Sequence, residues 1–309
     1  MRHLFIDGNN LAARSKHAMS ELSTTDGRKS GAVLGFLKGL SWCRNQTGIS
    51  LNSTVVFWDC GRSQERIKIY PDYKAGRKMN KRDTPEEMEE FKQYHMQLEA
   101  LHNILRCAGV RQVKVEGVEA DDLISIFCNT VGGSKVIQSG DADFHQLYSP
   151  LVGIFDPKKG LLGLVDMEKK WGSTDIQKYV LIKAMIGDAS DNIKGVPQIG
   201  KARASLVAPF IRLSRDPSKD YGWRIRRDGA PDEKQAVWVK KALKNRSIIK
   251  RNVSLMRLPP TWEDSHYSLD QAEEALIQWM DRPSMNRRSF IAALESYELN
   301  SILENMNSW

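Results

Sequence analysis

The sequence predicts an α/β protein in which a mostly parallel central sheet is flanked by helices and followed by a helical C-terminal region. Two segments, 4–6 and 54–58, are apolar or β-prone at consecutive positions, and each is followed by an aspartate. Such runs are typical of strands that are buried on both faces of a parallel sheet. Segments with helical spacing of apolar residues separate the predicted strands, which favours helical crossover connections.

The bulk composition indicates an ordinary globular protein. At 309 residues, with 41% hydrophobic and 27% charged residues, the chain can form one large domain or two smaller ones. No apolar run reaches the length of about 18 residues that a membrane span needs, and the apolar part of the N-terminus is too short for a secretion signal. Four scattered cysteines without a Cys-x-x-Cys pair favour a reducing compartment. We therefore expect a cytoplasmic protein that does not associate with membranes.

The charge balance points to a polyanionic partner. The chain has 46 basic and 38 acidic residues and a net charge of +8. Several of the acids fall at candidate metal positions, so the rest of the chain is more basic than the net charge suggests. A basic body around an acidic centre suits nucleic acid. The alternative is a basic protein without such a partner.

The first strands and helices follow from simple patterns. Leu4-Phe5-Ile6-Asp7 predicts a buried strand, Gly8-Asn9-Asn10 predicts a turn, and apolar spacing predicts a helix over 30–44. A second strand over 54–59 again ends in an acid, Asp59. One aspartate at a strand end is ordinarily a turn or cap residue, but several strands that end this way favour a functional site.

A basic segment over 62–82 follows the second strand. It contains Tyr70 and Tyr73, whose rings offer faces for base stacking. Pro71 and Gly76 argue against one continuous helix, so we expect a mobile loop or short helices. A solvated charged loop without a partner is the alternative. The next helix begins at Thr84-Pro85 with an N-cap and two acids, and its predicted buried stripe is Met88, Phe91, Leu98, Leu101 and Leu105.

Acidic residues gather after the next two predicted strands, over 111–115 and 135–139. Glu119, Asp121 and Asp122 open a predicted helix, and Asp141 and Asp143 follow the second strand. Open α/β sheets bind ligands at the carboxyl ends of their strands. Two carboxylates about 5 Å apart repel by roughly 3 kcal/mol at an effective dielectric constant near 20. The cluster therefore needs cations, and oxygen-only ligands favour Mg²⁺ or Mn²⁺ over zinc.

A glycine-containing turn comes after the sheet. A predicted helix from Thr174 is interrupted by Gly187-Asp188-Ala189-Ser190-Asp191-Asn192, and Gly195-Val196-Pro197-Gln198-Ile199-Gly200-Lys201-Ala202-Arg203 follows. This pattern resembles a helix-hairpin-helix element, which holds phosphates through backbone N–H groups. The last hundred residues look helical and basic, with helices beginning near Pro231 and over 268–280, and no chemistry is evident after Trp262.

Taken in order, these motifs resemble the 5′-nuclease (flap endonuclease) superfamily, especially the phage members called 5′-exonuclease or ribonuclease H. The resemblance covers about residues 1–203. The motifs that carry it are Asp7, Asp59, Gly117-Val118-Glu119-Ala120-Asp121-Asp122, Ser139-Gly140-Asp141-Ala142-Asp143, and Gly187-Asp188 with Asp191-Asn192 and the glycine turn. It implies a PIN-like nuclease core over 1–173 with a basic arch at about 62–95. It also implies a helical DNA-binding region over 174–309, with the helix-three-turn-helix at about 187–203.

The resemblance also implies roles for individual residues. The first of two Mg²⁺ sites, where Mn²⁺ can substitute, would be surrounded by Asp7, Asp59, Glu119, Asp121 and Asp122. The second would be surrounded by Asp141, Asp143, Asp188 and Asp191. Lys74 and Arg77 would contact the scissile phosphate. DNA would be bound by Tyr73, Gly195, Val196, Gly200, Lys201 and Arg203. K⁺ is a candidate at the turn, although Gln198 stands where many relatives have glycine.

The implied activity is two-metal hydrolysis of phosphodiesters at 5′ ends or flaps of DNA and RNA–DNA duplexes during primer removal. The implied protein is a monomer, located in the host cytoplasm if phage-encoded, and a single-strand-binding protein or sliding clamp is a candidate partner. The alternatives are a PIN-type ribonuclease of single strands and a non-catalytic protein that binds DNA junctions. A metal-dependent phosphatase is less favoured, because the chain has two separate basic regions.

Overall fold

The central sheet is mostly parallel, as predicted, and the structure confirms the fold class. The computed structural model describes residues 1–76, 84–211, 231–259, 261–306 and 309. The strand order is β3-β2-β1-β4-β5-β6, and only β6 runs antiparallel to its neighbour. The strands are β1 (Arg2–Asp7), β2 (Thr54–Phe57), β3 (Arg111–Val113), β4 (Ser134–Gln138), β5 (Val152–Asp156) and β6 (Gly160–Leu161).

The central strand β1 lies between β2 and β4, so the strand order reverses around it. In open parallel sheets, the crevice at such a reversal is where ligands bind. Each neighbour of β1 brings its carboxyl end to the same edge, because Phe57 is paired with Asp7 and Gln138 with Ile6. The aspartates at the ends of these strands, Asp7, Asp59 and Asp141, therefore lie at one edge of the sheet.

Alternating side chains of the strands divide the apolar core between the two faces of the sheet. Leu4 and Ile6 pack on one face, and Phe5 packs on the other. The first face is covered by α1 (Gly8–Ala18), α2 (Gly31–Thr47), α4 (Pro85–Cys107), α12 (Arg287–Ser296) and α13 (Asn300–Leu303). The second face is covered by α5 (Ala120–Thr130) and α11 (Leu269–Met280).

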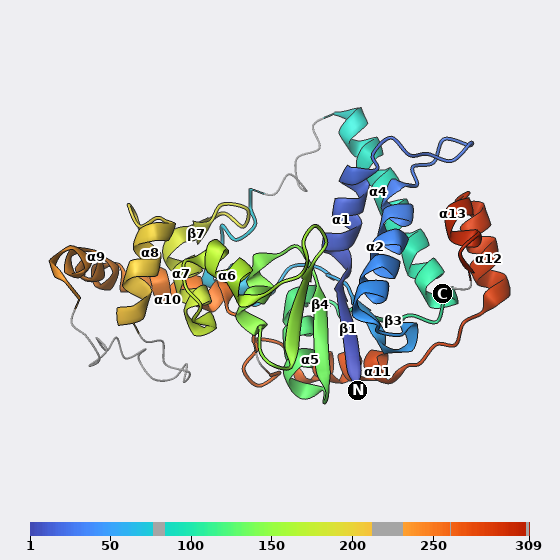
Figure 1. Ribbon diagram of the computed structural model, residues 1–309. Helices are drawn as coiled ribbons and strands as arrows, with labels where there is room; N and C mark the ends of the chain where they lie inside the picture. Colours follow the sequence, from blue (N-terminus) through green and yellow to red (C-terminus); the bar gives the residue numbers. More distant parts are fainter. Residues whose placement is uncertain (77–83, 212–230, 260, 307–308) are drawn as a thin grey trace.

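A helical region extends from one side of the sheet (Figure 1). It contains α6 (Leu164–Trp171), α7 (Tyr179–Ile186), the short hairpin β7 (Gly187–Asp188) and β8 (Ile193–Lys194), α8 (Lys201–Val207), α9 (Glu233–Lys244) and α10 (Arg246–Met256). After α10 the chain returns to the sheet, where α11 contacts β3 and α12 contacts α4. The C-terminal segment is thus part of the body of the protein.

Two local predictions were wrong. The turn expected at Gly8–Asn10 is the start of α1, because the Asp7 side chain caps that helix by accepting a hydrogen bond from the Asn10 N–H (3.1 Å). Met88, expected in the buried stripe of α4, is 60% exposed, since the first turns of this long helix extend beyond the core. All four cysteines are unpaired; Cys43 and Cys128 are buried, and Cys60 and Cys107 are partly exposed.

Candidate metal centre and nucleic-acid interface

The three strand-end aspartates lie at the reversal point of the sheet. Asp7 is almost fully buried and accepts hydrogen bonds from the Ser139 hydroxyl (2.8 Å) and the Asn10 N–H. Burial raises the pKa of Asp7 to about 7, and the nearby charges of Asp59 and Asp141 act in the same direction. The structure therefore brings Asp7, Asp59 and Asp141 together, as the sequence predicted.

Two asparagines connect these strand ends. The side-chain oxygen of Asn9 accepts from the Asp59 N–H (3.0 Å), and that of Asn10 accepts from the Gly140 N–H (3.2 Å). Asp59 in turn accepts from the N–H of Ala120 at the start of α5 (2.8 Å). Sequence reasoning treated both asparagines only as turn residues, although their amides link the acidic loops.

Glu119, Asp121 and Asp122 form the densest group of carboxylates among the described residues. One oxygen of each lies within 4.8 Å of the others, at the start of α5. Burial raises the pKa of Asp121, and the charge of Asp122 raises it further. We refer to these three residues as the acidic cluster.

Arg66 of the short helix α3 (Gln64–Ile69) is buried against the acidic cluster. Its Nη1 lies 2.6 Å from Glu119 Oε2 and 4.0 Å from Asp121 Oδ1, and its Nη2 lies 2.8 Å from Asp122 Oδ1. The guanidinium therefore offsets part of the negative charge. We did not assign Arg66 a role from the sequence, where it was one of many basic residues between 62 and 82.

Tyr73 and Lys74 also contact Glu119. The Tyr73 hydroxyl donates to Glu119 Oε2 (3.0 Å), and Lys74 Nζ lies 2.8 Å from the same oxygen. Although burial opposes it, the charges of Arg66 and Lys74 lower the pKa of Glu119 to about 2. Tyr73 is 3% exposed, so the ring that we expected to face DNA is buried. Arg77, predicted to act with Lys74, lies outside the described residues.

A second acidic group forms around Lys183 of α7. Its ammonium group contacts Asp143 and lies 2.8 Å from Asp188 Oδ2. Burial and the charge of Asp141 raise the pKa of Asp143 to about 6, although Lys183 opposes this shift. For Asp188, the Lys183 cation outweighs burial and lowers the pKa to about 2. Lys183 was not predicted from the sequence.

Asp191 connects the two acidic groups through the backbone. Its N–H is directed at Asp188 Oδ1 (3.4 Å), and its carbonyl accepts from the N–H of Lys74 (2.9 Å). Lys74 has a positive φ of 56° and Asn192 one of 58°. Non-glycine residues rarely adopt this conformation, which is concentrated at functional loops.

The glycine turn is built on close backbone contacts. A Cβ on Gly195 would lie 2.1 Å from the Ile186 carbonyl oxygen, so only glycine fits there. The Val196 side chain is buried, and the Val196 N–H donates to the Met185 carbonyl (2.8 Å). Neither the side chain nor the N–H of Val196, which was predicted to bind DNA, is therefore available for a direct contact with DNA. Gly200 is the exposed N-cap of α8.

Basic side chains surround this turn. Arg203 donates to the Gln198 carbonyl (2.6 Å), and its guanidinium carbon lies 3.8 Å from the centre of the Trp238 ring. Lys201, which is exposed, donates to the Lys169 carbonyl (2.6 Å). Arg251 donates to the Lys194 carbonyl (3.2 Å). The Gln198 and Lys194 carbonyls thus each accept a hydrogen bond from a guanidinium group.

The acidic groups themselves fit hard divalent cations. Their donors are carboxylate oxygens, which Mg²⁺ and Mn²⁺ prefer. The pKa values of Asp7 and Asp143 are raised first by burial and then by the negative charge of neighbouring aspartates. Asp7, Asp59 and Asp141 lie at the strand ends, Glu119, Asp121 and Asp122 lie at the α5 terminus, and Asp143 and Asp188 share Lys183.

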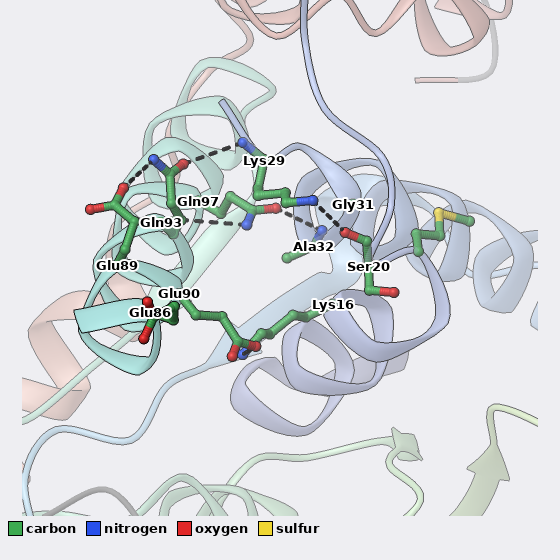
Figure 2. Close-up of a pocket in the computed structure, with 11 residues that line it drawn as sticks. Lys16, Ser20, Lys29, Gly31, Ala32, Glu86, Glu89, Glu90, Gln93 and Gln97 are labelled. Atoms are coloured by element: carbon green, nitrogen blue, oxygen red, sulfur yellow. Dashed lines mark hydrogen bonds and ion pairs between the residues drawn. The ribbon is translucent and has the colours of Figure 1, made fainter. Parts of the chain in front are cut away.

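Two cavities differ in their relation to the acidic residues. A cavity of ≈ 460 Å³ lies between the end of α1, the start of α2 and the first turns of α4, with Lys16 directed at Glu90 across it (Figure 2). It contains none of the predicted site residues. A larger, open cavity of ≈ 1780 Å³ is lined in part by Arg66, Asp122 and Tyr267, and so reaches the acidic cluster.

Gln97, which lines the smaller cavity, should contribute to stability. Its side-chain oxygen accepts from the Ala32 N–H at the start of α2 (2.8 Å), and the residue is 3% exposed (Figure 2). We expect Gln97→Ala to lower the free energy of unfolding by about 1–3 kcal/mol, because a buried N–H loses its acceptor. Urea unfolding measures the change. Gln93→Ala, in the same cavity but more exposed, is the control, and equal losses in both variants would contradict the prediction.

The chain is similar to known proteins in its sequence and in its fold. Residues 2–175 match the family model of the 5′–3′ exonuclease N-terminal resolvase-like domain. The chain is 34% identical over 220 residues to DNA polymerase I of Rhizobium leguminosarum, covering 67% of this chain and 21% of that protein. It is 29% identical over 215 residues to a 5′–3′ exonuclease of Buchnera aphidicola, covering 68% and 71%. The chain spans about a fifth to a third of the DNA polymerase I relatives first matched.

Among solved structures, the fold is similar to that of the flap endonuclease of bacteriophage T5 in complex with DNA and metal ions. The TM-score is 0.65, with 20% identity over 96% of this chain and 100% of that one. No described helix combines the length and apolar character needed to cross a membrane.

Proposed function

Because the chain belongs to the 5′–3′ exonuclease family, we propose that it is a structure-specific 5′ nuclease that hydrolyses phosphodiesters at 5′ ends or flaps of DNA and RNA–DNA duplexes. The observation that supports this most is the meeting of acids from four separate segments at the reversal point of the sheet. Three cations, Arg66, Lys74 and Lys183, lie directly on these acids.

The proposed mechanism assigns two groups of residues to two divalent ions. The first would be held by Asp7, Asp59, Glu119, Asp121 and Asp122, and the second by Asp141, Asp143, Asp188 and Asp191. Bound divalent ions supply a water of lowered pKa and stabilise charge on the phosphate oxygens. Lys74, which is held by Glu119, and Arg77 offset the charge that develops on the phosphate. We propose Mg²⁺, with Mn²⁺ as a substitute, and K⁺ is a candidate at the glycine turn.

Duplex DNA is bound, in this proposal, by the glycine turn and the helices around it. Gly195, Gly200, Lys201 and Arg203 lie at the turn, and exposed lysines continue along α9 and α10 as Lys240, Lys244 and Lys250. Contacts of this kind are to phosphates and select shape rather than base sequence. We propose a monomer in the cytoplasm, for which a single-strand-binding protein or sliding clamp is a candidate partner.

The substrate proposal is tested with an end-labelled panel: 5′ flap, nicked duplex, RNA–DNA hybrid and single-stranded RNA, each with Mg²⁺ or with EDTA. We expect Mg²⁺-dependent cleavage of the flap and of the hybrid. Preference for single-stranded RNA would instead favour a PIN-type ribonuclease. Tight flap binding without any cleavage would favour a junction-binding protein.

Binding should depend steeply on salt and weakly on sequence. Each phosphate neutralised contributes a slope of about −0.9 to the logarithm of affinity against the logarithm of salt concentration. With Lys201, Arg203 and the α9 and α10 lysines engaged, we expect a slope of roughly −4 or steeper for duplex DNA. Fluorescence anisotropy in Ca²⁺ between 50 and 300 mM salt, on two unrelated sequences, measures this. A shallow slope with strong sequence preference would contradict backbone binding.

A further inference from the structure

Described residues between α10 and α12 make hydrogen bonds at several points beside the acidic cluster. We call residues 257–259 and 261–281 the C-terminal strap. The Pro259 carbonyl accepts from the Ser125 hydroxyl of α5 (2.5 Å), and the Gln271 side chain donates to the Glu116 carbonyl (2.7 Å). Further along, the Gln278 side chain pairs with both the N–H and the carbonyl of Lys114. The strap lies outside residues 2–175, which match the family model.

Tyr267 links the strap to the acidic cluster by a hydrogen bond. Its hydroxyl donates to Asp122 Oδ2, and the other oxygen of Asp122 accepts from Arg66 Nη2 (2.8 Å). Both oxygens of Asp122 thus accept hydrogen bonds from side chains. The residue is only 2% exposed, so it has little contact with solvent. The same Arg66 donates through Nη1 to Glu119 Oε2 (2.6 Å). A chain of hydrogen bonds thus runs from Tyr267 through Asp122 and Arg66 to Glu119.

The helix that carries Arg66 is held from the C-terminal side by a second contact. Arg251 of α10 stacks on the ring of Tyr70, with its guanidinium carbon 4.3 Å from the ring centre. Tyr70 immediately follows α3, and α3 packs against α10. The placement of Arg66 therefore depends on the C-terminal part of the chain through α10 and through Tyr267.

We propose that Tyr267 is a positioning residue of the acidic cluster, which fixes Asp122 and through it the guanidinium of Arg66 against Glu119. This assigns Asp122 to orienting Arg66, so that within the cluster Glu119 and Asp121 would be the residues that hold a metal ion. Residues that orient metal-binding carboxylates by hydrogen bonds typically change metal affinity or activity by 10–100-fold when they are lost. The expected effect on cleavage rests on the proposed function, whereas the expected effect on metal binding does not.

Tyr267→Phe is the direct test, because it removes one oxygen and keeps the ring. Mn²⁺ binding to the DNA-free protein is measured by electron paramagnetic resonance, and we expect the dissociation constant to rise by about 10-fold. Flap cleavage should lose a similar factor in kcat, with KM for DNA unchanged, since the strap residues named here contact the protein itself. Tyr297→Phe is the matched control: its hydroxyl, also in the C-terminal part, is directed at the Met96 carbonyl (3.4 Å), away from the cluster.

A double-mutant cycle separates positioning from a general loss of structure. In an Asp122→Ala background, Tyr267→Phe should have almost no further effect on Mn²⁺ affinity, because both oxygens that link Tyr267 to Arg66 are already gone. Additive effects, or unchanged Mn²⁺ affinity in Tyr267→Phe, would overturn the proposal. Weakened Mn²⁺ binding by Tyr267→Phe in a protein that cleaves no 5′-ended substrate would support the positioning role and refute the nuclease.

Discussion

Replacing Asp141 and Asp143 together by asparagine should reduce flap cleavage by about 10³-fold or more, because the second of the two proposed metal sites then loses two of its four proposed carboxylates. Asp143 and Asp188 both contact the ammonium group of Lys183. Burial and the charge of Asp141 raise the pKa of Asp143 to about 6, so Asp141 and Asp143 interact electrostatically. Asparagine keeps the size of each side chain and removes its negative charge. Binding of flap DNA should be unchanged or tighter, since less negative charge then faces the phosphates.

The control for this variant is Glu273→Gln with Glu274→Gln. Both residues are exposed on α11 and change the net charge by the same amount as the two aspartates. Single-turnover cleavage of an end-labelled flap, with binding measured separately in Ca²⁺, distinguishes chemistry from affinity. If the Asp141→Asn, Asp143→Asn protein cleaves at the control's rate, these residues do not hold a catalytic ion.

The strand-end acids could be predicted because each follows a run of residues that only a buried strand explains. Residues 4–6 and 55–58 are apolar at consecutive positions, which predicts buried strands of a parallel sheet. The carboxyl ends of these strands, and Asp7 and Asp59 with them, were therefore expected at one edge of the sheet. The acids converge because parallel strands end at the same edge of the sheet, and the apolar runs in the sequence are sufficient to predict those strands. The domain boundary near residue 173 stays a prediction, because the C-terminal helices return to both faces of the sheet.

The cations on the acids could not be predicted in the same way. Arg66 is one of many basic residues between 62 and 82, and nothing in its spacing distinguishes it from Lys68, which is exposed. Tyr267 lies 145 residues from Asp122, and its role depends on the path of the strap rather than on any local motif. Tyr73 was expected to face DNA because it lies in a basic segment, yet its hydroxyl meets Glu119 inside the core.

Loss of the Arg66 charge should have the largest effect on stability. In Arg66→Met, a side chain of similar length remains, but Glu119 and Asp122 lose the guanidinium that both of them contact. These partners are 4% and 2% exposed, so water cannot replace the lost hydrogen bonds. Breaking a buried ion pair from one side typically costs about 3–5 kcal/mol, and we expect the free energy of unfolding to fall by that amount.

Lys68→Met is the matched control for Arg66→Met, because Lys68 lies on the same helix and its ion pair with Glu65 is exposed to solvent. A surface pair of this kind is worth about 0–1 kcal/mol, so the two variants should differ by several-fold in their effect. Urea unfolding of both proteins in EDTA, followed by circular dichroism, gives the comparison without any contribution from bound metal. Equal and small losses of unfolding free energy in the two variants would contradict the prediction. They would mean that Lys74 and Tyr73 are sufficient to stabilise the buried carboxylates, and that Arg66 is not an essential link between Tyr267 and Glu119.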